Sequence, residues 1–212
     1  MPRPSRPAPA PRSWVLVPAV AAPVAMIGGW LLAEALAPGF DPVSRTISEL
    51  ATAAVPRPGV MTAGLLVTGL AHVATTAGLR GVPRSGRLVL ALGGVGTAAV
   101  GLLPLDRVPS AHGVAAAVAF GALALWPAVS ARRSGPWPLR AAVAVPATAT
   151  LLALLGWFVV EQARGGGVVG LAERAVAGAE SLAPLAVVLA LRVSRRRAGS
   201  LPRPGAAGGL RG

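Results

Sequence analysis

The chain has 212 residues, of which 54% are hydrophobic and 13% charged, whereas about 25% of the residues in an ordinary soluble domain are charged. This composition excludes a soluble globular domain and indicates a membrane protein. The net charge of +13 would suggest a nucleic-acid partner in a soluble chain. Here the Arg residues flank apolar segments, so we interpret them as topology signals and contacts to anionic lipid headgroups, and we expect membrane lipids and no nucleic acid as partners.

Six apolar stretches are long enough to cross a bilayer as helices, which takes about 20 residues each. They cover about residues 14–37, 59–79, 87–104, 111–131, 139–160 and 174–192. The first could be mistaken for a signal peptide, but its apolar run is long and Pro38 follows the candidate cleavage site, so we expect a retained anchor. The predicted fold is all-α, a bundle of six transmembrane helices at residues 14–192 between disordered, Pro-rich basic tails at 1–13 and 193–212.

The Arg residues also orient the predicted bundle. Fifteen of them lie in the two tails and in the second and fourth loops, against five on the other side. Because Lys and Arg are enriched in cytoplasmic loops, this bias places both termini in the cytoplasm. The abundance of Ala, Gly, Pro and Arg is typical of a high-GC genome, so we expect a multi-pass protein of a bacterial plasma membrane.

The first loop, GFDPVSRTISELA at residues 39–51, has the pattern of a short helix. Asp41 can cap free backbone N–H groups, and Pro42 is favourable at the first helical position. The apolar residues that follow share one helical face, namely Val43, Ile47, Leu50, Ala51 and Ala54. This pattern predicts an amphipathic helix that lies on the outer leaflet or folds over the mouth of the bundle.

All seven acidic residues fall in the predicted outer half of the protein, and His112 lies there too. The candidates for a polar cluster at this end are Asp41, Ser44, Ser48, Glu49, Asp106, His112, Glu173, Arg174 and Glu180. For several of these residues the simpler interpretation is a loop charge that is solvated at the membrane surface and has no function. His112, six residues after Asp106, could act as a base, a metal ligand or a hydrogen-bonded anchor.

Two ionisable residues, Glu180 and His72, lie more than a helical turn inside the ends of the predicted spans. Glu180 would cost on the order of 2.5–3.5 kcal/mol at a helix centre, so we expect it to face the bundle interior or a wet cavity. Glu173 lies two turns earlier on the same face. Arg174 is the obvious local counter-charge, and Arg107 in the loop between the third and fourth spans is the alternative. His72 shares a face with threonines, which favours hydrogen bonds between helices and leaves a proton relay or a ligand contact as the alternative.

Small residues at a spacing of four predict close packing of the third span against the fourth. The two ridges are Gly93, Thr97 and Gly101, and Gly113, Ala117 and Gly121.

Three strings together resemble a known family. They are Asp-Pro-x-Ser-x-x-Ile-Ser-Glu-Leu from Asp41, Gly-Leu-Leu-Pro-Leu-Asp from Gly101 with His112-Gly113, and Ala-Glu-Arg from Ala172. In this order they resemble the bacterial membrane family catalogued as domain of unknown function 998, over about residues 14–192. The resemblance implies the fold and topology but no activity. Its motifs favour Asp41, Ser44, Ser48, Glu49, Asp106, His112, Glu173 and Arg174 as the functional cluster, and they do not include His72 or Glu180.

Three functions remain open at this stage. The first is a non-enzymatic membrane protein whose outer polar cluster binds a lipid headgroup, a small solute or a protein partner. The second is an outer-leaflet lipid hydrolase or transferase with His112 as its base, and the third is a small proton-coupled transporter. The chain lacks cysteine and has only two His residues at different depths, so no metal and no other cofactor are expected. A homo-oligomer stays open.

Overall fold

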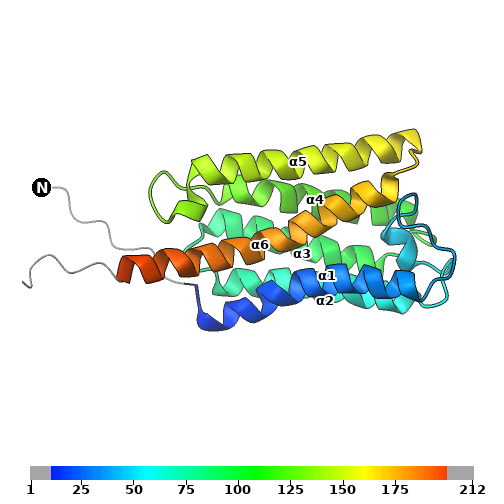
Figure 1. The fold of residues 1–212 in the computed structure, drawn as a ribbon, viewed down its shortest axis with the longest axis horizontal. Helices are drawn as coiled ribbons and strands as arrows, with labels where there is room; N and C mark the ends of the chain where they lie inside the picture. The colour runs from blue at the N-terminus through cyan, green and yellow to red at the C-terminus, as the bar shows by residue number, and fades with distance from the viewer. Residues whose placement is uncertain (1–10, 200–212) are drawn as a thin grey trace, which may run out of the picture.

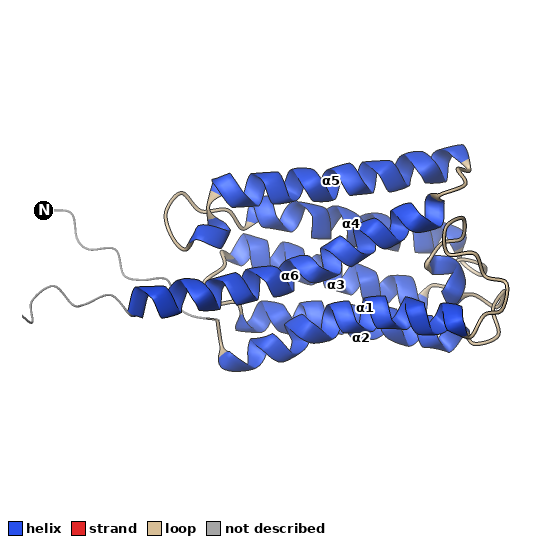
Figure 2. Ribbon diagram, in the orientation of Figure 1, coloured by secondary structure: helices blue, strands red, loops and turns tan. Residues whose placement is uncertain are grey.

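The computed structural model describes residues 11–199, which form a bundle of six long α-helices that run back and forth along one axis (Figures 1 and 2). Their bounds are α1 Leu16–Ala35, α2 Pro58–Gly78, α3 Arg84–Leu102, α4 Pro109–Val129, α5 Ala141–Arg164 and α6 Val169–Gly199. Short 3₁₀-helices lie at Ser13–Val15 (η1), Ser48–Ala51 (η2) and Trp137–Leu139 (η3). Each of the six α-helices is long and apolar enough to cross a membrane, so the predicted all-α fold with six spans is confirmed.

The last helix is longer than the sequence pattern predicts. We expected a disordered tail from residue 193, but α6 continues to Gly199. The stretch RVSRRRA has no Pro or Gly to stop a helix, and Arg is a good helix former. The remaining parts of the predicted tails, residues 1–10 and 200–212, lie outside the described residues.

The first four helices pack closely in chain order because glycines remove side chains from their contacts. A Cβ atom on Gly69 of α2 would stand 2.4 Å from the carbonyl oxygen of Gly94 on α3. A Cβ on Gly96 of α3 would stand 2.8 Å from the amide nitrogen of Ala119 on α4. The backbones of α2, α3 and α4 are therefore almost in contact, as small-residue helix packing in membranes allows.

The predicted ridge on the fourth span is wrong, although the one on the third span is buried as expected. Nothing lies within 4 Å of a Cβ built on Gly113 or Gly121, whereas the buried contacts of α4 come from Ala115, Ala119 and Leu123. These residues stand two positions away from the predicted ridge, and two positions rotate a helix by about 200°. Spacing alone identified a ridge of small residues on α4 but not the side that faces α3.

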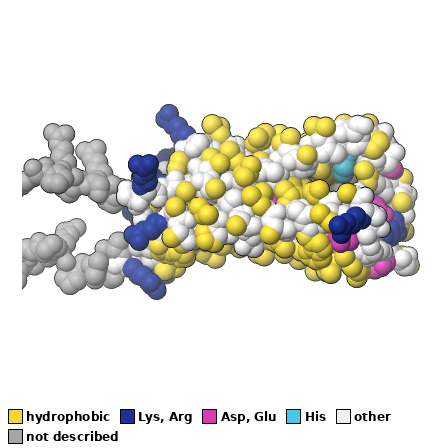
Figure 3. All heavy atoms as spheres, turned by 90° about the horizontal axis from the view of Figure 1, so that it is seen from above, with side chains coloured by type: hydrophobic (Ala, Val, Ile, Leu, Met, Phe, Trp, Pro, Cys, Tyr) yellow, Lys and Arg dark blue, Asp and Glu magenta, His cyan; other side chains and the backbone are white. Residues whose placement is uncertain are grey.

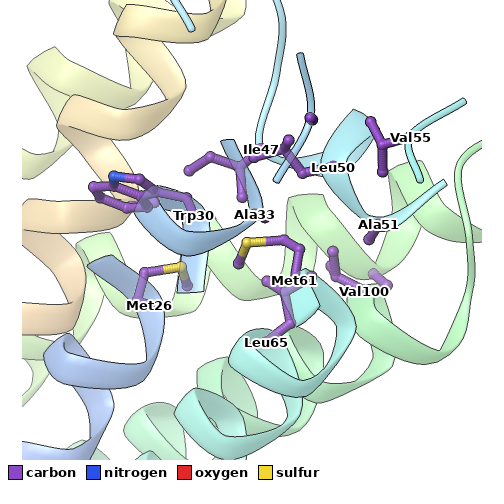
Figure 4. Close-up of a cluster of buried hydrophobic side chains, with 13 residues drawn as sticks. Met26, Trp30, Ala33, Ile47, Leu50, Ala51, Val55, Met61, Leu65 and Val100 are labelled. Atoms are coloured by element: carbon purple, nitrogen blue, oxygen red, sulfur yellow. The ribbon is translucent and has the colours of Figure 1, made fainter. Parts of the chain in front are cut away.

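The first loop, residues 36–57, folds into the core instead of lying on a leaflet. Ile47, Leu50 and Ala51 pack with Trp30 of α1 and Met61 of α2 (Figure 4). The amphipathic helix predicted from Pro42 does not form. Turns lead into the four-residue helix η2, which buries Leu50 and Ala51 while Val43 stays exposed. A rigid helix would place only one face against the bundle, and the turns let the apolar residues reach deeper between α1 and α2.

Helix α5 is the least embedded of the six. Its buried residues are Ala144, Thr148 and Leu151, all in the half that follows the loop after α4. None of the side chains in the other half of α5 is fully buried. This leaves room between α4 and α5 at one end of the bundle.

The two ends of the bundle differ in charge (Figure 3). We call the end with the α2–α3 turn, the α4–α5 loop and the last turns of α6 the arginine end. We call the opposite end, with loops 36–57, 103–108 and 165–168, the acidic end. Figure 3 shows Arg side chains at the former, and the acidic side chains and a His, with a few Arg, at the latter.

Gly69→Ala tests the close approach of α2 and α3. Because its Cβ would meet backbone atoms, we expect a loss of about 1–3 kcal/mol in unfolding free energy. Gly121→Ala is the matched control, since it also lies within a helix but faces open space; it should be neutral or stabilising by up to about 1 kcal/mol. Unfolding of the detergent-solubilised proteins measures both, and equal stabilities would contradict the packing described.

Candidate functional site

Glu173, in the first turns of α6, fastens the first loop to the bundle. Its side chain is only 4% exposed. One carboxyl oxygen accepts a hydrogen bond from the backbone N–H of Ile47 at 2.5 Å, and the other lies 3.1 Å from Ser48 Oγ. The loop segment that begins η2 is therefore held by a buried acid from a helix far away in the sequence.

His112, in the first turn of α4, extends this contact to a third element. Its Nδ1 lies 2.7 Å from the carbonyl oxygen of Leu103, and its Nε2 lies 3.0 Å from Ser48 Oγ. A carbonyl oxygen can only accept, so Nδ1 carries a hydrogen and donates it. The result is one chain of hydrogen bonds from Leu103 through His112 and Ser48 to Glu173.

The Ser48 hydroxyl has one hydrogen and two neighbours that compete for it. If it donates to Glu173, then Nε2 of His112 must donate to Ser48, which makes an imidazolium and a carboxylate. If it donates to His112 instead, then Glu173 must be the protonated partner that donates to Ser48. The two arrangements contain the same number of protons, so a proton can move between Glu173 and His112 through Ser48 without changing the charge of the chain.

Arg174, the next residue on α6, joins three segments. Its Nε donates to Glu34 Oε1 of α1 at 2.8 Å, and its Nη1 donates to the carbonyl oxygens of Arg45 and Gly170 at 2.8 Å each. Nη2 also lies 2.6 Å from Glu34 Oε1, as an ion-pair contact without hydrogen-bond alignment. We expected Arg174 to be the counter-charge of its neighbours Glu173 and Glu180, but its ion pair is with Glu34, whose side chain is 17% exposed.

Asp41 and Glu49 shape the loop that contains them. Asp41 accepts from Ser44 Oγ at 2.5 Å and from the Val43 N–H at 3.0 Å, and these two hydrogen bonds lower the pKa of Asp41 below 3.8. Partial burial raises the pKa of Glu49, but hydrogen bonds from the Thr46 N–H and from Arg45 outweigh it and lower the pKa below 4.5. Both acids are thus held as carboxylates by partners within the loop.

The remaining candidates lie elsewhere. Asp106 accepts a hydrogen bond from the Ala53 N–H at 3.1 Å and so ties the loop after α3 to the first loop. Ser44 is bound to Asp41. Glu180 and His72 are buried deeper in the bundle, at 1% and 0% exposure. Among the residues described, no group of three or more His, Asp or Glu side chains could hold a metal ion.

A pocket of about 480 Å³ opens beside Ser48 and His112, between α4 and the loosely packed half of α5. Its polar end is formed by Thr46, Ser48, His112, Gln162 and Glu173. Its apolar wall includes Ala116, Phe120, Leu155, Phe158 and Val159. The rings of Phe120 and Phe158 are in contact, with centroids 5.5 Å apart.

Sequence reasoning did not identify four contributors to this site. They are the Leu103 carbonyl, Glu34 as the partner of Arg174, Gln162, and the aromatic pair Phe120 and Phe158. Glu34 carried a usable signal, because an acid close to the end of an apolar helix needs a partner. The other three contributors depend on how α4 and α5 are rotated about their axes, and no local sequence pattern predicts that rotation.

Six apolar helices, with buried His112 and Glu173 and most of the other acids at one end, define a multi-pass integral membrane protein with a polar site at the acidic end. The family model described as Protein of unknown function (DUF998) matches residues 19–191, and the chain belongs to this family. This confirms the resemblance found in the sequence motifs. No curated protein and no solved structure matches the chain.

A double-mutant cycle tests the ion pair that holds α1 to α6. Arg174→Gln leaves Glu34 partly buried without its counter-charge, so we expect a loss of about 2–5 kcal/mol in unfolding free energy. Adding Glu34→Gln should restore part of this loss. Replacing the exposed Arg164 with Gln should change stability by less than about 0.5 kcal/mol. Additive effects of the two site substitutions would show that the pair contributes nothing.

Proposed function

We propose that this protein binds one amphiphile, a lipid or lipid-like molecule, in the pocket between α4 and α5. The observation that carries the proposal is the division of the pocket into a polar end and an apolar wall. Ser48, His112 and Gln162 would contact the headgroup, while Phe120 and Phe158 would contact the acyl chain. A volume of about 480 Å³ is in the range of small-molecule sites and accommodates a headgroup with the first part of a chain.

We further infer that the acidic end faces the outside of a bacterial plasma membrane. The supporting argument is the excess of Arg in the loops at the arginine end, which favours the cytoplasmic side. The amphiphile would then enter from the outer leaflet, and α5, with its weakly packed half at the acidic end, borders the entrance.

The polar end of the pocket favours a headgroup that donates hydrogen bonds. The Glu173 carboxyl group and the Gln162 carbonyl accept, and the hydroxyls of Ser48 and Thr46 accept as well. No Arg side chain lines this pocket in the described part of the chain, and Arg174 is bound to Glu34. An ammonium or hydroxyl headgroup therefore fits this end better than a bare phosphate does.

The contact of 3.0 Å between Ser48 Oγ and His112 Nε2 favours one second candidate, an outer-leaflet hydrolase or transferase with Ser48 as nucleophile and His112 as base. We favour binding for two reasons. The Ser48 hydroxyl is also engaged by Glu173. The N–H of the adjacent Ile47 donates to Glu173, so it is not free to stabilise a developing oxyanion.

Single-cysteine labelling tests the orientation, and the chain suits it because it contains no cysteine. We expect Ala54→Cys, in the exposed part of the first loop, to react with a membrane-impermeant maleimide in intact cells. Ser134→Cys, exposed at the arginine end, should react only after the cells are permeabilised. The reverse pattern would invert the bundle and remove the outer leaflet as the source of the amphiphile.

Native mass spectrometry with defined lipids tests the binding. We expect phosphatidylethanolamine, whose ammonium group donates hydrogen bonds, to remain bound to the purified protein more than phosphatidylcholine, whose trimethylated nitrogen cannot donate. Gly113→Phe should abolish retention, because Gly113 lines the pocket and its Cβ points into open space, so the ring fills the pocket without displacing the backbone.

Gly121→Phe is the matched control. It lies on the same helix, also faces open space and does not line the pocket, so it should retain the lipid like the wild type. Equal retention of the two lipids would contradict the headgroup argument, and retention by Gly113→Phe would contradict the pocket itself. Fatty acid released from the bound lipid by the wild type but not by Ser48→Ala would instead establish the hydrolase.

A further inference from the structure

A second, smaller cavity of about 40 Å³ lies deeper in the bundle, where α2, α3, α4 and α6 meet. His72 of α2, Thr97 of α3, and Glu180 and Ser181 of α6 provide polar groups in its lining. Ser48 and Glu173 line this cavity as well as the lipid pocket. The hydrogen-bonded chain at the acidic end is therefore a partition with the pocket on one side and the cavity on the other.

Four side-chain atoms at this cavity are buried without a partner. Neither carboxyl oxygen of Glu180 and neither ring nitrogen of His72 makes a hydrogen bond within the described part of the chain. Glu180 is 1% exposed and His72 is fully buried. Buried polar groups are almost always hydrogen-bonded because an unpaired one is costly, so an occupant of the cavity is needed to satisfy these atoms.

The wall of this cavity is mostly apolar, and its few polar groups are chiefly acceptors. The hydroxyls of Thr97 and Ser181 already donate to the carbonyl oxygens of Gly93 and Gly178 on their own helices, at 2.9 Å each. Glu173 receives the Ile47 N–H at the partition. Apart from the one N–H that a neutral His72 carries, the polar side chains named here have no free hydrogen, so an occupant that donates hydrogens suits the two oxygens of Glu180.

The charged groups around the cavity do not offer a counter-charge to Glu180. Arg174, the residue after Glu173 on α6, does not line the cavity and is engaged by Glu34 and by two backbone carbonyls. The ionisable side chains that line the cavity are Glu173 and Glu180 of α6 and His72 of α2. A proton on Glu180 or between these groups is the simplest positive charge that fits.

The volume decides the size of the occupant. A water molecule needs at least about 10–15 Å³ of such space, so a cavity of about 40 Å³ admits about three water molecules and no organic solute. The sequence left open a proton-coupled transporter that uses Glu180 and His72. This cavity has room for a proton and water but not for a transported solute, so only the proton-binding part of that hypothesis applies to it.

We propose that this cavity is a hydrated proton-binding site, in which water molecules bridge Glu180 and His72 and one exchangeable proton is bound among them. The proton enters from the acidic end. His112 passes its Nε2 proton to Ser48 Oγ as Ser48 passes its own to Glu173, and Glu173 passes a proton to the cavity water and so to Glu180. Each step breaks one bond to hydrogen and forms another, and the aqueous phase replaces the proton on His112. The site does not require a lipid in the pocket.

Infrared spectroscopy of the full chain in liposomes tests the proposal through the carbonyl stretch of a protonated carboxyl group. We expect a band at neutral pH that Glu180→Gln removes. When the medium is changed to D₂O, the band should shift as deuterium replaces the proton. Ser48→Ala, which interrupts the chain from His112 to Glu173, should slow this shift several-fold.

Thr75→Val is the control for the exchange rate. Thr75 is buried one turn from His72, donates to the Ala71 carbonyl and does not line the cavity, so its loss should leave both the band and its rate unchanged. If Glu180→Gln does not fold, Glu180→Asp should displace the band instead of removing it. The proposal fails if no band depends on Glu180, if the band does not shift in D₂O, or if Ser48→Ala exchanges as fast as the wild type. Lipid retention is measured in a separate experiment. The lipid-binding proposal and the proton-site proposal can therefore fail independently of each other.

Discussion

The hydrogen bonds between Glu173 and the first loop are the contact on which the acidic end of this protein depends. Through them a buried acid of α6 holds Ile47 and Ser48 over the bundle. Ile47 and Leu50 can then fill the core between α1 and α2, and the Ser48 hydroxyl comes within reach of His112 on α4. A loop held only by its own turns would leave Glu173 buried without partners, which is costly in an apolar environment. The fixed conformation of the first loop, the packing of the core beneath it and the geometry of the site therefore have one common cause.

Ser48 links the two cavities chemically because its hydroxyl belongs to both walls. The direction in which it donates depends on which neighbour carries the proton. A headgroup that donates a hydrogen bond to Ser48 or Glu173 from the pocket would compete with the bonds that join them. Occupation of the pocket would then change how readily a proton crosses the partition. The headgroup would also change the proton affinity of Glu173, and because binding linkage is reciprocal, the protonation of Glu173 would change the affinity for the headgroup by that same factor.

The fold follows from the sequence far more directly than the site does. Each spanning helix satisfies its own backbone groups within a run of about 20 residues, so hydropathy and the helix-starting Pro58 and Pro109 suffice to locate it. Asp41-Pro42 has the same local signal, yet no helix follows, because burial of Ile47 and Leu50 outweighs a local preference. The candidates Ser48, His112 and Glu173 could be grouped by charge and topology. The partner of Arg174 and the existence of the pocket could not, because both depend on helix rotation, which hydropathy leaves free.

The bundle combines tight and loose packing, and each suits one of its two cavities. Glycine contacts bring α2, α3 and α4 almost backbone to backbone, which keeps the inner cavity at about 40 Å³ and restricts it to water and protons. Helix α5 has no such contacts in its half at the acidic end, and the space beside it reaches about 480 Å³. A bundle packed uniformly tightly would exclude the amphiphile, and one packed uniformly loosely would admit lipid to Glu180. The difference between α3 and α5 is therefore what gives the bundle a small inner cavity and a larger outer pocket on the two sides of Ser48 and Glu173.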